Sequence, residues 1–410
     1  MMIHLKKYIQ WTSVILLVGT IVGSISAFFL VSLDYVTNTR ESQFIWVLLL
    51  PLGGLIIGYT YYFLSKGVEG GNNRLINEMI VPKRKIHWKM TPLVLFGTLA
   101  THLFGGSAGR EGTAIQMGGA TADQFSFWFN WGERQRKIVL RMGVAAGFAS
   151  IFGTPIAGIF FAYELGRDKK LDFTGIIPII LVSFLANLVC DLWQVEHTHY
   201  VVNEVTPISF TALFWVVIAG IIFGLAALCF NYCKQFFNYL FARLIKYAPL
   251  RPFIGGIIIV GVVFLLDTTK YLGLGLPTIV DAFSNPANNY DFIIKLLLTA
   301  FTLGAGFKGG EATPLFFMGA TLGSILVWFI PLPVSLLAGM GFIAVFSGAT
   351  NTPIACTFIG VELFGWEGIL YFFIACLIAY LISGRTSVYA TQQKYLRKLS
   401  VIQYRKMNKQ

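Results

Sequence analysis

A glutamate preceded by an arginine lies in the glycine-rich stretch Gly105-Gly-Ser-Ala-Gly-Arg-Glu-Gly-Thr113, directly after an apolar segment. Charges at membrane depth are expensive unless they face a protein interior or a watery cavity, so Arg110 and Glu111 are candidates for function. A helix that begins among glycines presents unpaired N–H groups and the positive end of its dipole, which attract an anion. Glu111 can occupy that position when charged, and burial favours its neutral form when an anion displaces it. The structural alternative is an ion pair of Arg110 with Glu111 that only tolerates a helix end.

This arrangement occurs twice in the chain. Six residues recur 200 positions later, so that Gly106, Gly109, Glu111, Thr113, Gly119 and Ala120 match Gly306, Gly309, Glu311, Thr313, Gly319 and Ala320. Further on, Thr154-Pro-Ile-Ala157 matches Thr352-Pro-Ile-Ala355 at an offset of 198. The chain therefore divides into two related halves, residues 1–200 and 201–390, followed by a short basic tail, 391–410. Glycine- and proline-broken helices in both halves favour an inverted over a parallel repeat.

The elements that must carry these motifs are membrane helices. Of 410 residues, 56% are hydrophobic and 12% charged, and the mean hydropathy is +0.70. A soluble domain cannot bury that much apolar surface, so the bilayer is the expected solvent. Trp11 to Val36 is too long for a signal peptide and reads as a first span. Several other apolar runs are near the roughly 20 residues that a spanning helix needs and others are clearly shorter, which indicates broken or tilted segments.

The net charge of +12 is distributed as an orientation signal rather than as a nucleic-acid surface. The basic clusters are Lys6-Lys7, Lys83 to Lys85, Arg134 to Lys137, Arg167 to Lys170, and a tail with Lys394, Arg397, Lys398, Arg405, Lys406 and Lys409. They lie in short loops and at the chain ends, so both termini are expected in the cytoplasm.

Other possible sites are weaker. Gly105-x-Ser107-x-Gly109 has the form of a hydrolase elbow, but it lacks the sheet context and the acid and histidine partners, with only His102 nearby. His197 and His199 lack a third metal ligand, and the five cysteines indicate neither disulfides nor a metal site, so neither metal nor cofactor is expected.

Four acidic or basic side chains have structural interpretations. Glu164 and Glu362 occupy equivalent positions, which favours a capping or anchoring role over chemistry. Lys308 and Glu311 would lie one turn apart in a helix and would then pair.

In combination, these motifs resemble the CLC family of chloride channels and anion/proton antiporters. Gly109-Arg-Glu-Gly112 is similar to the family's GREGP block, Gly309-Gly-Glu-Ala-Thr-Pro314 to its second anion-binding helix start, and Gly273-Leu-Gly-Leu-Pro277 to an intervening glycine motif. The resemblance implies an all-α, multi-span integral membrane protein, a homodimer of inverted repeats with broken re-entrant helices and one pore per subunit. It also implies a bacterial plasma-membrane location, a gating and proton-carrying Glu111, amide ligands around Glu311 and Ala312, and a hydroxyl donor in Tyr389.

Departures from the family pattern resemble its fluoride branch. Thr113 replaces the proline of GREGP, Asn72-Asn73 stand in the loop that carries a serine in chloride transporters, and Leu165 stands where exchangers have an inner proton glutamate. Fluoride is small and accepts strong hydrogen bonds, so hydroxyl, amide and N–H groups can replace its water. The expected anion-binding residues are Gly109, Arg110, Gly112, Thr113, Asn72, Asn73, Gly310, Glu311, Ala312, Thr313 and Tyr389. The expected function is therefore export of fluoride against proton entry and fluoride resistance. The alternatives are a chloride/proton exchanger, a passive chloride channel and, from another class, an intramembrane hydrolase using Ser107.

Overall fold

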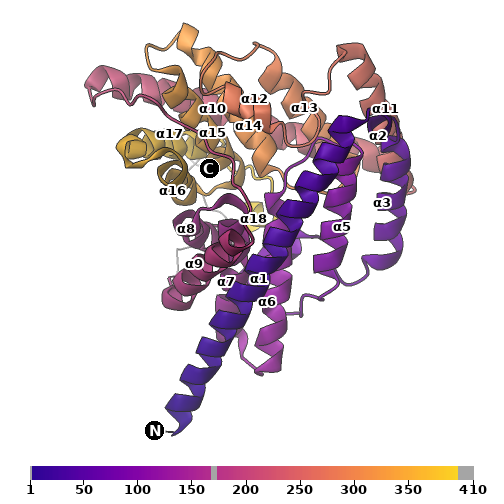
Figure 1. Cartoon of the computed structure of the whole chain (residues 1–410), viewed down its shortest axis with the longest axis vertical. Helices are drawn as coiled ribbons and strands as arrows, with labels where there is room; N and C mark the ends of the chain where they lie inside the picture. The colour runs from indigo at the N-terminus through magenta and orange to yellow at the C-terminus, as the bar shows by residue number, and fades with distance from the viewer. Residues whose placement is uncertain (1, 168–172, 396–410) are drawn as a thin grey trace, which may run out of the picture.

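The computed structural model describes residues 2–167 and 173–395, and this part of the chain is built of α-helices joined by short connections (Figure 1). Lys169, Lys170 and the basic residues from Arg397 to Lys409 lie outside the described residues. The helices are α1 (Met2–Ser42), α2 (Ile45–Leu48), α3 (Leu50–Leu64), α4 (Asn72–Ile80), α5 (Met90–Leu103), α6 (Glu111–Trp128), α7 (Glu133–Phe152), α8 (Pro155–Leu165), α9 (Ile176–Leu192), α10 (Phe210–Leu244), α11 (Leu250–Leu266), α12 (Leu276–Asp281), α13 (Asp291–Gly304), α14 (Ala312–Ile325), α15 (Val334–Thr350), α16 (Pro353–Phe364), α17 (Ile369–Ile382) and α18 (Ala390–Tyr395). The all-α expectation is confirmed.

Among the described residues, two helices are long and apolar enough to cross a bilayer, Lys7–Ser42 within α1 and Phe210–Leu244. The other apolar helices have 10–17 residues, so they are the shorter, broken segments that the apolar runs predict. Large apolar side chains are exposed along α9, at Ile177, Leu181, Phe184 and Leu188. A bilayer or another protein surface is the environment that such a row fits.

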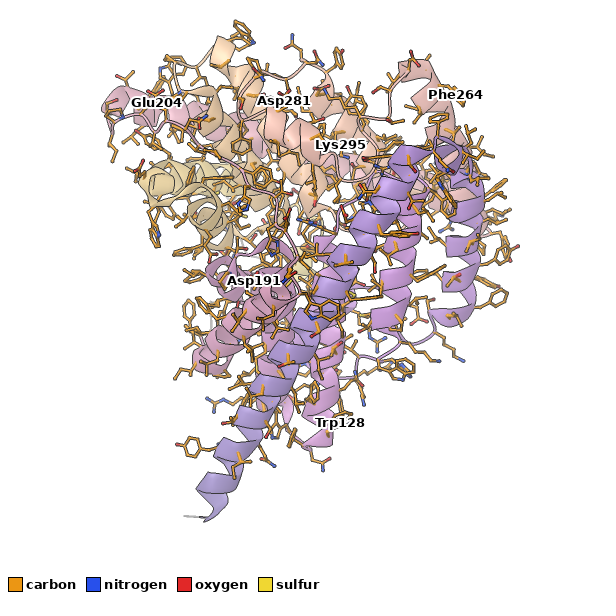
Figure 2. All side chains as sticks on the ribbon, viewed as in Figure 1. Trp128, Asp191, Glu204, Phe264, Asp281 and Lys295 are labelled. Carbon is orange, nitrogen blue, oxygen red and sulfur yellow. The ribbon has the colours of Figure 1, made fainter. Side chains whose placement is uncertain are left out.

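The two halves run in opposite directions. Trp128, at the end of α6, lies at the same end of the molecule as the N-terminus, whereas Asp281 lies at the opposite end (Figure 2). Helix α14 starts beside Glu111, where the N–H of Thr313 donates to the Glu111 carboxylate over 3.1 Å. It extends toward the Asp281 end, where the N–H of Ala287 donates to the Ser324 hydroxyl near its last turn. Helices α6 and α14 thus leave one central point in opposite directions, as an inverted repeat requires.

The repeated Thr-Pro motifs begin equivalent helices in the two halves. Helix α7 ends at Gly153 (φ 72°) and α15 ends at Asn351 (φ 62°), both in the left-handed conformation that closes a helix and that glycine and asparagine adopt most readily. In each case a Thr-Pro pair follows, and the proline takes the first helical position, where no N–H is needed. The repeat is therefore conserved in the backbone as well as in the sequence.

Glu164 and Glu362 each cap the start of a helix in the opposite half of the chain. The Glu362 carboxylate accepts from the N–H groups of Ile156 and Ala157, each over 2.8 Å. The Glu164 carboxylate accepts from the equivalent N–H groups of the other half, at the start of α16, over 3.1 and 2.8 Å. Each acid thus satisfies otherwise unpaired donors at a helix start and the positive end of its dipole. The predicted capping role is confirmed.

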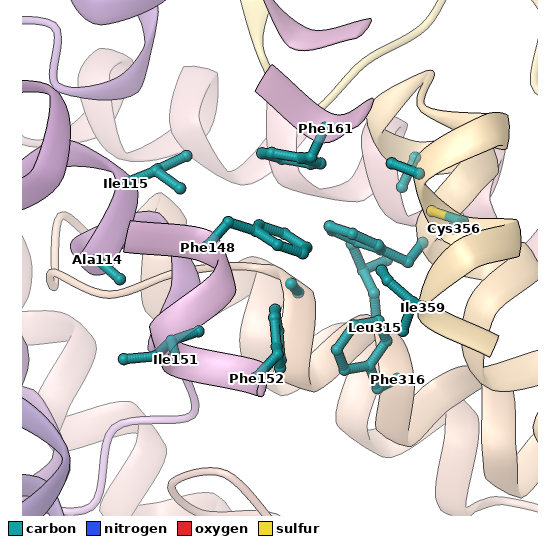
Figure 3. Close-up of a cluster of buried hydrophobic side chains, with 14 of the residues drawn as sticks. Ala114, Ile115, Phe148, Ile151, Phe152, Phe161, Leu315, Phe316, Cys356 and Ile359 are labelled. Carbon is teal, nitrogen blue, oxygen red and sulfur yellow. The ribbon is translucent and has the colours of Figure 1, made fainter. Parts of the chain in front are cut away.

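Aromatic rings fill the interior between the halves (Figure 3). Phe148 on α7 stacks on Phe161 of α8 with ring centres 4.2 Å apart. In the other half, Phe316 on α14 stacks on Phe342 of α15 at 3.9 Å. Phe161 also stacks on Phe346, at 6.1 Å, which joins the two clusters. Packed aromatic side chains therefore fill the interior between α7 and α8 of one half and α14 and α15 of the other.

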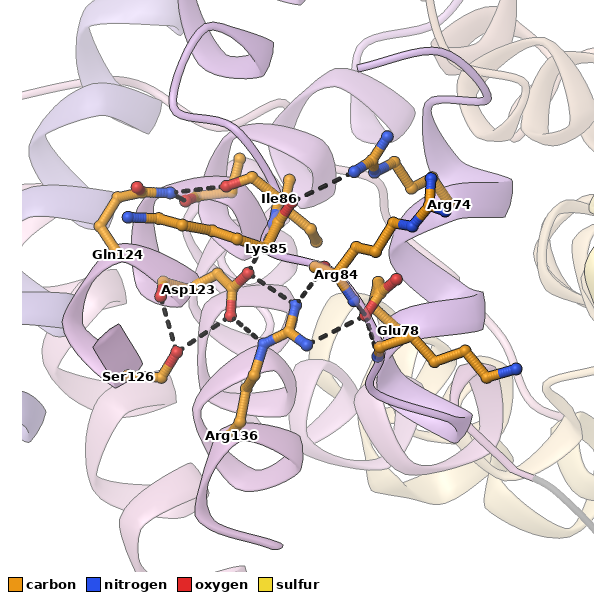
Figure 4. Close-up of polar contacts among 11 residues, drawn as sticks. Arg74, Glu78, Arg84, Lys85, Ile86, Asp123, Gln124, Ser126 and Arg136 are labelled. Carbon is orange, nitrogen blue, oxygen red and sulfur yellow. Dashed lines mark hydrogen bonds and ion pairs between the residues drawn. The ribbon is translucent and has the colours of Figure 1, made fainter. Parts of the chain in front are cut away.

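A buried ionic network ties together α4, α6 and α7 (Figure 4). The Arg136 guanidinium donates to both Asp123 carboxylate oxygens, over 2.7 and 2.9 Å, and to Glu78 over 3.0 Å. It also donates to the backbone carbonyl of Arg84 over 2.7 Å. The network holds the basic connection between α4 and α5 against α7.

Candidate functional site

The two glycine-rich loops meet at the centre of the molecule. Gly109 and Gly310 exchange N–H···O bonds, each 2.7 Å long, as an antiparallel bridge. A Cβ atom on Gly109 would lie 2.8 Å from the Glu111 carboxylate, and one on Gly310 would lie 2.6 Å from the N–H nitrogen of Gly112. Only glycine lets the backbones approach this closely. The bridge fixes the starts of α6 and α14 side by side.

Glu111 lies at this junction with its carboxylate turned into the second helix start. The residue is only 3% exposed. Its carboxylate accepts from the N–H groups of Thr313 and of Arg110, each over 3.1 Å, and from the Thr313 hydroxyl. An acid side chain therefore occupies a cluster of donors at a helix start, which is the arrangement that also binds anions.

Arg110 contributes charge rather than a close ion pair. Its Nε atom lies 4.0 Å from Glu111 Oε1, and that Nε atom has no hydrogen-bond partner among the described residues. The Arg110 side chain is 12% exposed. The ion pair considered as the structural alternative is present only as this 4.0 Å contact, because the carboxylate is held more closely by the donors at the helix starts.

Thr113 and Thr313 are equivalent in the repeat but have different hydrogen-bond partners. Its hydroxyl lies 2.6 Å from the Thr98 hydroxyl on α5, whereas the Thr313 hydroxyl donates to Glu111. We therefore assign Thr113 to the packing of α5 against α6 rather than to anion contact. The resemblance alone did not separate the two threonines.

A cavity of about 690 Å³ extends from the site toward the connection between α3 and α4. Glu311 and Tyr389 both line it. The Lys234 ammonium, on α10, donates to the Glu311 carboxylate and, over 3.1 Å, to the carbonyl of Val388. The expected pairing of Glu311 with Lys308 is wrong. Residues 307–309 precede the helix, so the one-turn spacing does not apply, and the Lys308 ammonium lies 4.3 Å from the centre of the Tyr61 ring instead.

Asn72 and Asn73 both line this cavity but have different environments. The Asn72 amide nitrogen lies 3.0 Å from the position of a Cβ atom on Gly112, beside the central site. The Asn73 carboxamide oxygen instead accepts from the N–H of Thr391 over 3.0 Å. Asn72 is thus the residue of the pair that faces the helix starts, and Asn73 holds α4 against α18.

Sequence reasoning missed two lysines within apolar helices. Lys234 lies on α10 and contacts the site, as described above, while Lys295 lies on α13 and is fully buried. The Lys295 ammonium donates to the carbonyls of Tyr271 and Gly273 over 3.0 and 2.7 Å. A lysine inside an apolar run was the available signal, because such charges mark functional or structural positions in membranes.

The features of a hydrolase do not assemble around Ser107. Its hydroxyl pairs with the Thr299 hydroxyl over 2.8 Å, and His102 has no hydrogen-bond partner at either ring nitrogen among the described residues. A nucleophile elbow requires a base within hydrogen-bond reach of the serine.

The fold and the site together define a multi-span membrane protein. The N-terminal ends of α6 and α14, one from each inverted half, meet at the Glu111 side chain and at the hydrogen-bond donors around it. Residues 53–384 match the family model described as voltage gated chloride channel. The chain belongs to this family of integral membrane transport proteins.

Three relatives are similar over most of the chain. A "chloride/fluoride channel protein" of Pseudomonas syringae pv. tomato is 44% identical over 399 residues, covering 95% of this chain and 88% of the relative. The crystal structure of a CLC-type fluoride/proton antiporter superposes with a TM-score of 0.90 at 33% identity, covering 93% of this chain and 97% of the other. The "H(+)/Cl(-) exchange transporter ClcA" of Vibrio vulnificus is 25% identical, covering 85% of this chain and 80% of the relative.

Proposed function

We propose that the protein exports fluoride from the bacterial cytoplasm in exchange for protons that enter. The observation that carries this proposal is the position of Glu111, whose carboxylate accepts from the Thr313 N–H and hydroxyl and from the Arg110 N–H. An anion that takes these donors must displace the carboxylate, and a carboxylate displaced into a buried site is favoured in its neutral, protonated form. Alternation of Glu111 and fluoride at one set of donors couples the two ions.

The proposed anion pathway runs from the large cavity past Asn72, Glu311 and Tyr389 to the donors at the helix starts. Amide and hydroxyl groups along it provide hydrogen bonds that compensate fluoride for lost water. Gly109, Gly112, Gly310 and Ala312 contribute backbone at the junction. The relative called a fluoride/proton antiporter supports fluoride as the ion and antiport as the mode.

The orientation follows from charge. The basic connection between α4 and α5 and the start of α7 lie toward the N-terminal end, where Arg136 binds the Arg84 carbonyl. Short basic loops face the cytoplasm. We therefore place the N-terminal end, the tail and the large cavity on the cytoplasmic side of the plasma membrane. A homodimer, as the family resemblance implies, is part of the same proposal.

Liposomes loaded with fluoride test the function directly, with a fluoride electrode and a pH indicator read in the same suspension. Fluoride should leave and protons should enter in a fixed ratio. Glu111→Gln, which cannot carry the proton, should remove proton movement from any remaining halide flux. Glu133→Gln, an exposed acid at the start of α7, is the control and should keep the wild-type ratio.

The second candidate is a passive halide pathway, which the name of the Pseudomonas relative favours. Fluoride flux through the wild-type protein without proton movement would establish that candidate and reject antiport. Faster exchange of chloride than of fluoride would instead favour a chloride/proton exchanger like the Vibrio relative.

A further inference from the structure

A second, much smaller cavity lies beside Glu111 and shares no lining residue with the large one. Its volume is about 10 Å³, close to the ~10–15 Å³ that one water-sized particle needs. Its polar wall is formed by Arg110, His197, Thr198, Tyr200 and Thr313, and phenylalanine and leucine side chains complete it. Two of these residues, Arg110 and Thr313, are the residues that hold Glu111.

The connection between α9 and α10, residues 193–209, closes this cavity. His197, Thr198 and Tyr200 come from this connection, whose Glu204 lies at the end of the molecule opposite the N-terminus (Figure 2). In the orientation proposed above, that end faces the outside. The small cavity therefore lies between Glu111 and the outer solution.

The wall of the small cavity has hydrogen-bonding capacity that the protein itself does not use. Among residues 2–167 and 173–395, the buried Nε atom of Arg110 has no hydrogen-bond partner, and the two buried ring nitrogens of His197 have at most the backbone of Ile151. Buried polar groups are nearly always paired, because a buried donor without a partner costs free energy. Two such atoms, Arg110 Nε and one ring nitrogen of His197, on the wall of one small cavity are typical of a site completed by a ligand.

The charges around His197 favour an anion as this ligand. The titratable groups whose charges act on the imidazole are Arg110, Asp191 and His199, and Asp191 Oδ1 lies 3.8 Å from its Nε2 atom and is half exposed. Burial lowers the pKa of His197, and the charge of Arg110 lowers it further, while Asp191 raises it. The ring is therefore neutral at neutral pH and has one N–H to donate, and Arg110 supplies the positive charge.

We propose that the small cavity is an outer binding site for a single fluoride ion and that His197 closes it. The proposal rests on the proposed fluoride export. Thr313 connects the two positions, because its hydroxyl donates to Glu111 and also lines the cavity. When Glu111 leaves the helix starts, the same hydroxyl is free to donate to the ion that moves outward. Fluoride fits because it is close to water in size and accepts strong hydrogen bonds.

Right-side-out and inside-out membrane vesicles present the outer and the inner face to added fluoride. His197→Ala should raise the half-saturating fluoride concentration at the outer face about tenfold, the effect of losing one hydrogen bond to a charged partner. The value at the inner face and the proton-to-fluoride ratio should stay unchanged, which also shows that the variant is folded. His197→Gln keeps an N–H donor and should recover most of the loss. His199→Ala, exposed on the same connection, is the matched control.

An outer half-saturating concentration in His197→Ala equal to that in His199→Ala would overturn the proposal, since the cavity would then hold only water. Equal shifts at both faces would also overturn it, because His197 would act through the structure as a whole. Failure of the proposed function has a different signature, because the wild-type protein itself would then move no protons with fluoride.

Discussion

The hydroxyl of Thr313, in the second half of the chain, donates a hydrogen bond to the carboxylate of Glu111, in the first half. The equivalent hydroxyl of Thr113 pairs with Thr98 instead. The same motif of the inverted repeat thus gives two threonines with different partners, one at the Glu111 carboxylate and one in the packing of α5 against α6. The two equivalent acids differ in the same way, because Glu111 accepts hydrogen bonds from the start of the opposite helix, whereas Glu311 pairs with Lys234.

Thr313→Val should slow coupled fluoride export about tenfold. The substitution keeps the branched shape and the N–H group but removes a hydroxyl donor, and a hydrogen bond to a charged group contributes about 1.5–3 kcal/mol. Export is measured with a fluoride electrode on loaded liposomes. Thr113→Val removes a hydroxyl of the same size outside the pathway and should change the rate by less than about twofold. Equal rates for the two variants would contradict the assignment.

Lys234→Met should raise the half-saturating fluoride concentration at the inner face about tenfold. The change leaves the Glu311 carboxylate without its cation beside the anion pathway, and a unit charge at close range repels an anion by about 1–4 kcal/mol. The double variant Lys234→Met/Glu311→Gln removes both charges and should return toward the wild-type value. Fluoride uptake by inside-out vesicles measures the half-saturating fluoride concentration at the inner face. Lys246→Met, at an exposed lysine, is the control. A double variant as impaired as the single one would contradict this electrostatic account.

The central features of the site could be predicted from the sequence because they are local. Glycines followed by Glu111, repeated at Glu311, indicate two helix starts that attract an anion, and the offset of the repeat indicates the two halves. Pairings between distant residues could not be predicted in this way. The Lys234 ammonium reaches Glu311 across 77 positions, and nothing in the spacing of Lys308 shows that it turns to Tyr61 instead. Direction of side chains, rather than type or position, is what the structure adds.

Glu362→Ala should lower the free energy of unfolding by about 2 kcal/mol. The carboxylate caps two N–H groups at the start of α8, and loss of a helix cap costs about 0.5–2 kcal/mol, with a larger cost when buried donors are left unpaired. Thermal unfolding in detergent measures the change, and Glu164→Ala should behave similarly because it caps α16. The exposed Glu367→Ala, near the end of the same segment, is the control. Loss of proton coupling with unchanged stability would instead assign these acids to transport.

Arg136→Met should destabilise the protein by about 3–5 kcal/mol, because it leaves the buried Glu78 and Asp123 carboxylates without their cation. The exposed Arg134→Met, on the same turn of α7, should have an effect below about 0.5 kcal/mol. Detergent unfolding curves compare the two. A triple variant with Glu78→Gln and Asp123→Asn should recover part of the loss, since the unpaired charges are then removed. If the triple variant is as unstable as Arg136→Met, the shape of the arginine side chain rather than its charge holds α4 against α7.

Gly319→Ala should prevent α14 from packing against α15, and with it the placement of Thr313. A Cβ atom at Gly319 would lie 2.0 Å from the backbone carbonyl oxygen of Gly341, which cannot move without shifting a helix. Gly261, in α11, is a matched helical glycine where a Cβ atom meets nothing within 4 Å. Gly261→Ala should therefore be neutral or stabilising by up to about 1 kcal/mol, the usual difference in helix propensity between glycine and alanine. The yield of monodisperse protein and its unfolding temperature measure both effects. A Gly319→Ala variant as stable as Gly261→Ala would show that α14 and α15 can separate by the width of a methyl group. The position of Thr313 relative to Glu111 would then not depend on this close helix contact.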